Sequence, residues 1–241
     1  MFNYPKEFYL ERHENTIHSA STITTILLEY LPRVRSVIDV GCGVGTWLSV
    51  LKERGVDKIM GLDGEWVDKD LLQIPRECFS EVDLNQLCND KKQKYDLAIS
   101  LEVAEHLPPE KAYEFICFLT NLSDRVLFSA AIPFQGGTNH INEQWQHYWA
   151  ELFYKKNYIV NDFIRAKIWD DKNIPCWYRQ NILVYSKGRA IKPPVKNKIK
   201  KIIPNILFNR CTETAMPLNI VHPDLYIHKS NIITTSSKRI V

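Results

Sequence analysis

Apolar positions along the chain follow two periods, one typical of helices and one typical of buried strands. Between residues 15 and 31 they recur at the spacing of an amphipathic helix, which Pro32 ends. Helical spacing returns after Trp47, after Pro108 and in the aromatic stretch 143–158. Short apolar runs between these segments predict strands, at 37–40, at 57–63, around Val82, at 95–101, at 126–130, at 163–169 and at 182–185.

The order of these elements predicts the fold class. Strands that alternate with helices form a mainly parallel sheet with helices on both faces. We therefore expect an α/β fold with a Rossmann-like, doubly wound sheet of seven strands. The alternation stops near Ser186. Residues 1–186 are thus predicted to form one domain, with 1–32 as an N-terminal helical cap, and 187–241 a basic C-terminal extension.

Charge is divided unevenly between these two parts. The 241 residues carry 31 Lys and Arg against 28 Asp and Glu, a formal net charge of +3. Residues 187–210 hold eight of the basic residues and no acidic one, so the rest of the chain carries a net negative charge. Such a segment suits a peripheral membrane contact or a phosphorylated substrate. Because it is nearly free of aromatic residues, nucleic-acid binding is disfavoured.

The sequence also carries expectations about the compartment. Its six cysteines include no CxxC pair, and no Cys and His residues have zinc-finger spacing, which favours free thiols in a reducing environment. The N-terminus lacks the pattern of a signal peptide. No apolar stretch reaches the length of a membrane span. A cytoplasmic protein without a transmembrane segment is expected.

A glycine loop follows the first predicted strand and opens a predicted helix. It reads Asp39-Val-Gly41-Cys-Gly43-Val-Gly45. Alternating glycines let a ligand lie against the backbone, and the helix start presents unpaired N–H groups. The spacing differs from the GxGxxG of dinucleotide-binding proteins. The preceding carboxylate would repel a pyrophosphate but can hold an ammonium group. The loop thus indicates a nucleoside that carries an amino acid and no diphosphate.

This D-x-G-x-G-x-G loop resembles that of the class I S-adenosylmethionine-dependent methyltransferases. The resemblance extends to Asp63 at the end of the second strand, where the family binds ribose, and to Asp83, where it contacts the adenine. Residues 100–107, SLEVAEHL, are similar to the family's segment after the fourth strand. The resemblance implies S-adenosylmethionine as cofactor, S-adenosylhomocysteine as product, and a cofactor site made of Asp39, Gly41, Gly43, Gly45, Asp63, Asp83, Leu84, Ser100 and Glu102.

Simpler interpretations of these acids stay open. Asp63 lies in a turn-like GLDG sequence, and Asp83 could cap a following helix. Glu102 and Glu105 could form a solvated helix edge, although their place beside the end of the fourth strand favours proximity to cofactor or substrate.

Methyl transfer to an oxygen also needs a group that takes the acceptor's proton. Three candidates follow the fourth and fifth strands: His106, His140 and Glu143. His147, Trp145 and Arg179 are candidates for substrate binding. His147 could instead be structural, Arg179 could form a surface ion pair, and about half of the aromatic helix could be core. No metal is expected, because the spacing of His140, Glu143 and His147 differs from HExxH.

Three further segments resemble a methyltransferase subgroup associated with bacterial surface-polysaccharide, or capsule, biosynthesis. They are HINEQWQHYW at 140–149, WYRQNIL at 177–183 and VHPDLY at 221–226. The resemblance implies a sugar or small glycan-precursor substrate, with or without phosphate, that is methylated on oxygen. The alternatives are an N-methyltransferase of a small phosphorylated amine such as phosphoethanolamine, a binding protein without turnover, and an enzyme acting on nucleic acid. The sequence does not indicate an oligomeric state.

Overall fold

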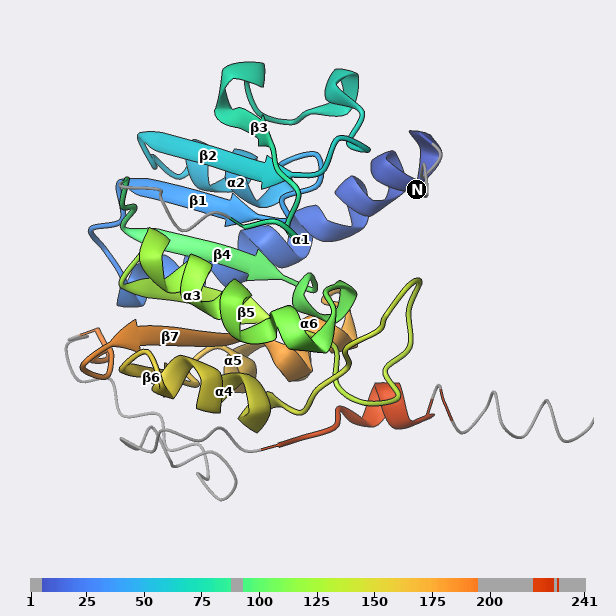
Figure 1. Cartoon of the computed structure of the whole chain (residues 1–241), viewed down its shortest axis with the longest axis vertical. Coiled ribbons are helices and arrows are strands. Elements are labelled where there is room, and N and C mark those ends of the chain that lie inside the picture. The colour runs from blue at the N-terminus through green and yellow to red at the C-terminus, as the bar shows by residue number, and fades with distance from the viewer. Residues whose placement is uncertain (1–5, 88–92, 195–218, 228, 230–241) are drawn as a thin grey trace, which may run out of the picture.

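The protein is built on one seven-stranded sheet, which the computed structural model shows in Figure 1. The structure describes residues 6–87, 93–194, 219–227 and 229. The strand order is β3-β2-β1-β4-β5-β7-β6, with β7 antiparallel to both of its neighbours and the other pairs parallel. The strands are β1 (Ser36–Val40), β2 (Lys58–Asp63), β3 (Phe79–Glu81), β4 (Leu97–Leu101), β5 (Arg125–Ser129), β6 (Tyr158–Asn161) and β7 (Leu183–Lys187).

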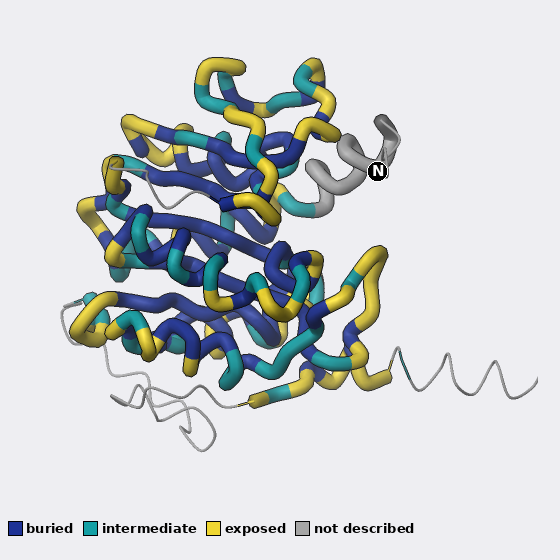
Figure 2. Tube along the Cα trace, viewed as in Figure 1, coloured by how far each residue is buried: buried dark blue, intermediate teal, exposed yellow. Residues whose placement is uncertain are grey.

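Helices cover both faces of the sheet, as the fold prediction requires. One face packs against α3 (Ala112–Leu122) and α4 (Gln146–Tyr154). The other packs against α1 (Lys6–Tyr30), α2 (Thr46–Glu53), α5 (Arg165–Ile168) and α6 (Cys176–Asn181). Figure 2 shows the strands buried between these two layers. Short 3-10 helices also lie between these elements in the described residues: η1 (Lys69–Leu71), η2 (Arg76–Cys78), η3 (Ala104–His106) and η4 (Pro109–Lys111).

The predicted fold class is confirmed, but one predicted strand is wrong. Residues 163–169 contain the helix α5 instead of a strand, while the strand β6 lies just before them. Asn157, at φ 63°, ends the aromatic helix early and releases Tyr158 into β6. The apolar side chains of Phe163, Ile164 and Ile168 fit a helical face equally well, and they pack with α1 and α2.

Two predicted helices have different bounds in the structure. The first begins at Lys6 and ends at Tyr30, just before the proline at position 32, so it starts earlier than the apolar pattern shows. The aromatic helix covers only part of 143–158. Among its aromatic side chains, Trp149 and Phe153 are buried in the core, whereas Trp145 and Tyr148 are half-buried.

Part of the C-terminal extension returns to the sheet domain. Asn219 Nδ2 lies 2.8 Å from His147 Nδ1, and Gln146 Nε2 on α4 donates to the carbonyl of Ile220 at 3.1 Å. Residues 223–227 then form a helical turn. Most of the basic segment 187–210 lies outside the described residues, so its predicted membrane contact has no structural counterpart here. In the part of the chain described, no helix combines the length and the apolar character needed to cross a membrane.

Candidate functional site

The glycine loop lies between β1 and α2, and Asp63 on the neighbouring strand fixes its shape. Gly41, Gly43 and Gly45 all have positive φ, between 54° and 85°. Asp63 Oδ2 accepts from the Gly43 N–H at 2.6 Å, and Oδ1 accepts from the Gly64 N–H at 2.7 Å. A Cβ at Gly43 would have no atom of another part of the chain within 4 Å. The loop thus leaves open space at the start of α2, where a ligand would face backbone N–H groups.

Two carboxylates lie at the base of this loop. Asp39 on β1 is 2% exposed and Asp63 is 7% exposed. Burial, reinforced by the negative charge of Asp63, raises the pKa of Asp39 well above its usual range. A cationic ligand would relieve this repulsion and hold both groups ionised. A sulfonium that carries an amino group meets that requirement, so these residues fit S-adenosylmethionine.

The segment after β4 packs directly against the glycine loop. A Cβ at Gly41 would collide with the side chain of Val103. Glu102, the residue before Val103, has a positive φ of 55°. The carboxylate of Glu102 accepts a hydrogen bond from Gln135 Nε2 at 2.8 Å and another from Asn181 Nδ2 at 3.3 Å. Burial raises the pKa of Glu102. The alternative of a solvated helix edge is wrong, because Glu105 is fully buried and the half-buried Glu102 has its carboxylate bonded to two amide side chains.

The remaining predicted cofactor residues differ in their surroundings. Leu84 is buried, and Ser100 is fully buried within β4. Asp83 is exposed, and its carboxylate accepts from the N–H and the side chain of Asn85 and from Gln86 Nε2. These bonds lower the pKa of Asp83 and cap a turn. The capping alternative is thus partly right, although a turn follows instead of a helix.

A loop that connects β5 to α4 places His140 beside the end of β4. Glu143 organises this loop: Oε2 accepts from the Phe134 N–H at 2.7 Å, and Oε1 accepts from the Gly136 N–H at 2.7 Å. Glu143 Oε1 also lies 2.9 Å from His140 Nδ1. Because a carboxylate only accepts, Nδ1 carries the proton and the lone pair of a neutral ring lies on Nε2.

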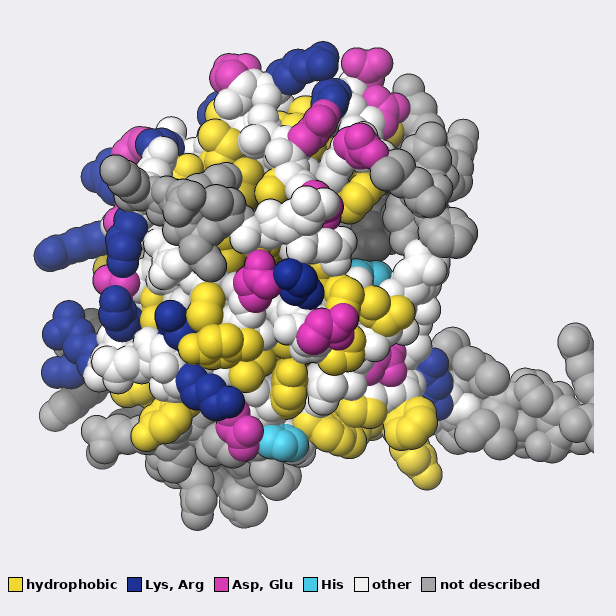
Figure 3. All heavy atoms as spheres, in the orientation of Figure 1, with side chains coloured by type: hydrophobic (Ala, Val, Ile, Leu, Met, Phe, Trp, Pro, Cys, Tyr) yellow, Lys and Arg dark blue, Asp and Glu magenta, His cyan; other side chains and the backbone are white. Residues whose placement is uncertain are grey.

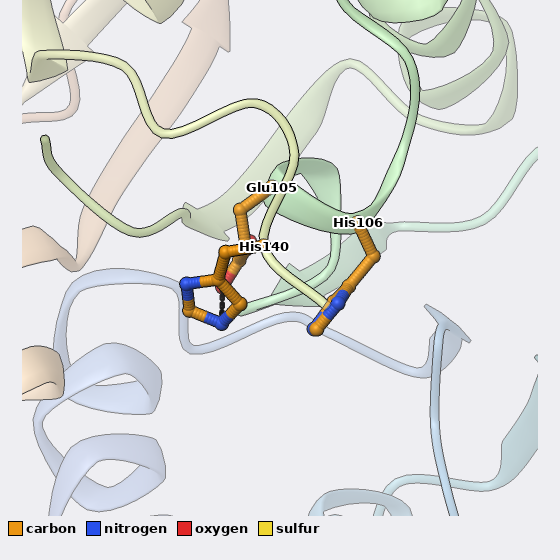
Figure 4. Close-up of side chains that lie close together, drawn as sticks. All are labelled: Glu105, His106 and His140. Carbon is orange, nitrogen blue, oxygen red and sulfur yellow. Dashed lines mark ion pairs between the residues drawn. The ribbon is translucent and has the colours of Figure 1, made fainter. Parts of the chain in front are cut away.

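The loop is tied to η3 through the main chain of Glu105. The carbonyl of Glu105 accepts from the N–H groups of Ile141 and Asn142, at 2.9 and 3.0 Å. As a result, His140 Nε2 lies 4.0 Å from Glu105 Oε1, and the rings of His106 and His140 meet edge to face at 4.9 Å. Figure 4 shows these three side chains converging from two segments. The structure therefore brings together all three predicted proton acceptors, with His140 in contact with both His106 and Glu143.

The predicted substrate-binding residues lie elsewhere. Arg179 is buried on α6, where Nη1 donates to the Trp169 carbonyl at 3.0 Å and Nη2 donates to Asp224 Oδ2 at 2.6 Å. His147 contacts Asn219, as described above. Trp145 is the residue before α4 and is half-buried. His147 and Arg179 therefore hold the C-terminal segment, and the structure does not bring them together with His140.

Two residues of the site, Gln135 and Asn181, were not predicted by the sequence reasoning, which had placed Glu105 near cofactor or substrate without giving it a role. Glu105 approaches His140, while Gln135 and Asn181 hold the carboxylate of Glu102. Glu105 had one signal, its place beside His106 at the end of a predicted strand. Gln135 and Asn181 had none, because their role depends on contacts across 33 and 79 positions of the chain.

Comparison with known proteins decides the family. A family model described as a methyltransferase domain matches residues 12–166, more than half of the chain. The chain belongs to this methyltransferase family. The match covers the glycine loop, the end of β4 and the loop that carries His140. The predicted enzyme class is thereby confirmed: the protein is an S-adenosylmethionine-dependent methyltransferase, with S-adenosylmethionine as its cofactor.

Solved methyltransferase structures share the fold. An O-methyltransferase family protein from Burkholderia thailandensis is 15% identical with a TM-score of 0.54, covering 74% of this chain and 59% of that protein. Magnesium protoporphyrin IX methyltransferase from Synechocystis PCC 6803 is 20% identical with a TM-score of 0.52, covering 72% and 84%. Human N-acetylserotonin methyltransferase is 15% identical with a TM-score of 0.52, covering 76% and 55%.

These identities are low, so the likeness concerns the fold. This methyltransferase spans about three-fifths of the Burkholderia protein and just over half of the human one. Among proteins of curated function, none matches its sequence.

Proposed function

We propose that this methyltransferase methylates a hydroxyl group of a sugar or small glycan precursor used in a bacterial surface polysaccharide. The observation that supports oxygen as the acceptor is the pairing of His140 with Glu143 at 2.9 Å. An imidazole whose Nδ1 is held by a carboxylate presents Nε2 for proton transfer. The ring of His140 contacts His106 on η3. The residue before η3, Val103, packs on the glycine loop, so η3 links the imidazole to the cofactor side of the site.

The chemistry assigns separate tasks to the two parts of the site. S-adenosylmethionine supplies a methyl group that is already activated, so the protein has to position the acceptor and remove its proton. The acceptor oxygen forms a bond to the methyl carbon while the sulfur–methyl bond breaks, which leaves S-adenosylhomocysteine. The simplest route for the hydroxyl proton is transfer to His140 Nε2, with Glu143 stabilising the imidazolium.

The class of acceptor rests on the three segments that resemble polysaccharide-associated methyltransferases. The contacts between two of them agree with a common role: Gln180 Oε1 accepts from the His222 N–H at 2.7 Å, and Arg179 binds Asp224. On the face drawn in Figure 3, Lys and Arg side chains gather mainly along the edge where the strands begin, away from the glycine loop. Among the described residues on this face, basic side chains therefore do not mark the glycine loop as a surface for nucleic acid.

An acceptor screen tests this proposal. The full chain is incubated with methyl-labelled S-adenosylmethionine and with matched hydroxyl acceptors, namely nucleotide sugars, and amine acceptors such as phosphoethanolamine. We expect methyl transfer to a hydroxyl acceptor and a fall in kcat of about 10²–10⁴-fold for His140→Ala, the usual contribution of a general base. Cofactor affinity should stay the same.

The control variant is His18→Ala, whose imidazole pairs with Asp171 on another part of the surface. It should keep full activity. Methylation of amines alone, with His140→Ala fully active, would contradict the proposal and favour the N-methyltransferase, since a neutral amine needs no base.

A further inference from the structure

We propose that Glu105, His106 and His140 bind a divalent transition-metal ion that activates the acceptor hydroxyl. The inference rests on the proposed function and assigns to this site a metal that sequence spacing did not indicate. The sequence argument against a metal concerned the spacing of His140, Glu143 and His147. The structure brings together a different set of possible ligands, which shares only His140 with that one.

The donor atoms already lie together. Glu105, His106 and His140 can each present one ligand atom, and these three atoms lie within 4.8 Å of one another. Glu105 Oε1 and His140 Nε2 are 4.0 Å apart (Figure 4). Ligands at 2.0–2.2 Å from one ion are separated by roughly 3–4 Å. Side-chain rotations that shorten the widest gap by about 1 Å would thus complete the coordination.

Both imidazoles are oriented as metal ligands usually are. A metal-bound histidine generally donates its other ring N–H to a carboxylate or a backbone carbonyl. His140 Nδ1 lies 2.9 Å from Glu143 Oε1, and His106 Nδ1 lies 3.3 Å from the Asn139 carbonyl. Both acceptors require a proton on Nδ1, so Nε2 of each neutral ring carries the lone pair.

The two loops are built around these rings. The backbone bonds from Ile141 and Asn142 to the Glu105 carbonyl hold His140 against η3. A Cβ at Gly137 would collide with the ring of His140, so only glycine leaves room for the imidazole there. The carboxyl group of Glu105 is fully buried, an environment in which a carboxylate is stabilised by a cation.

The ligand set indicates the kind of metal and its task. Two imidazole nitrogens and one carboxylate oxygen suit Mn²⁺, Fe²⁺, Co²⁺ or Zn²⁺ better than Mg²⁺ or Ca²⁺. Three protein ligands leave coordination positions for substrate, as in catalytic zinc sites. His106 is exposed, so the site opens to solvent. A hydroxyl bound to the ion loses its proton to water more readily, and the resulting oxygen attacks the methyl carbon. With the ion bound, His140 Nε2 would hold the metal and the acceptor's proton would pass to water instead of to this nitrogen, so the loss of activity expected for His140→Ala would come from loss of the ion.

Metal binding is measured on the untagged full chain after dialysis against EDTA. Titration calorimetry with Zn²⁺ and the visible spectrum of added Co²⁺ report binding without reference to activity. We expect one ion per chain, at least tenfold weaker binding for Glu105→Gln, His106→Ala and His140→Ala, and 10–100-fold weaker binding for Glu143→Gln, which removes the carboxylate behind a ligand. His18→Ala should bind as the wild type does.

Two outcomes would overturn the proposal: no binding of Zn²⁺ or Co²⁺ by the wild type, or equal binding by the wild type and the three ligand variants. Methyl transfer at full rate in EDTA would overturn the catalytic role while leaving the proposed function intact. Conversely, one bound ion with no methyl transfer to any hydroxyl acceptor would contradict the proposed function and leave the metal site standing.

Discussion

Asp39 and His140 show which properties of a residue can be predicted from its neighbours along the chain. Asp39 belongs to a seven-residue loop motif, so its place at the glycine loop follows from local spacing. His140 lies three residues before Glu143, and this short separation allows the contact that the structure shows. For Glu105 only proximity to the site was predicted, because its burial and its approach to His140 depend on a loop that lies more than thirty residues later.

The raised pKa of Asp39 implies that its ionised carboxylate lowers the stability of the empty protein, although the same charge is expected to favour binding of the cofactor. A carboxyl group whose pKa is raised on folding binds its proton more tightly in the folded state. The free energy of unfolding therefore falls as pH rises from the group's usual pKa through its raised one. Asp39→Asn removes this loss, so the variant should be more stable than the wild type at pH 7.

Cofactor affinity should change in the opposite direction. Losing a charged hydrogen-bond partner costs about 1.5–3 kcal/mol, which corresponds to roughly 10–100-fold weaker binding. Urea denaturation at pH 5 to 8 and calorimetry with S-adenosylhomocysteine check the two effects. Lower stability of Asp39→Asn at pH 7, together with unchanged affinity, would contradict this account of the loop.

At the scale of elements, the strand ends were predicted more accurately than the helix bounds. Each strand beside the glycine loop ends where its apolar run meets a polar or glycine residue, as β2 does at Asp63. The region 158–168 was misassigned because its apolar run fits both a strand and a helix. Its division into β6 and α5 depends on the turn at Asn157 and on stacking of Phe163 against Tyr30.

The C-terminal segment 219–227 is an element that sequence patterns did not place. It is held through Arg179, whose hydrogen bond with Asp224 lowers the pKa of that carboxyl group. A lowered pKa means that the stabilisation is present above the usual pKa of aspartate and is lost as pH falls through the lowered one. The Asp224 side chain is half exposed, so solvent limits the gain to about 1 kcal/mol.

Removing that carboxylate should loosen the segment. We expect Asp224→Asn to speed hydrogen exchange at the Leu225 and Tyr226 amides, which bond to the His222 carbonyl, by up to about fivefold at pH 7. The matched control is Asp57→Asn, which breaks an exposed pair with Arg35 just before β2. Exchange in residues 219–227 that stays unchanged in Asp224→Asn, or that changes equally in both variants, would show that Arg179 does not anchor the segment.

For the whole molecule, the alternation of strands and helices was enough to predict the doubly wound sheet, at one edge of which the glycine loop and the end of β4 meet. It could not predict that the loop after β5 and the segment after β4 would close over one another, or that part of the extension would pack on α4 and α6. Both depend on contacts between distant segments, such as those of Glu105 with Ile141 and of Gln180 with His222.

The central claim is that S-adenosylmethionine binds in the open space beside Gly43. It is tested most directly by titrating S-adenosylhomocysteine into the full chain and into two alanine variants. Gly43 and Gly55 both have positive φ, 54° and 87°, and open space where a Cβ would lie, so alanine should cost each about 1–2 kcal/mol of stability. Only Gly43 faces the proposed ligand.

We predict one binding site per chain, at least tenfold weaker binding for Gly43→Ala, and wild-type affinity for Gly55→Ala. Absence of binding by the wild type at millimolar ligand, or equal affinity of the two variants, would contradict the claim.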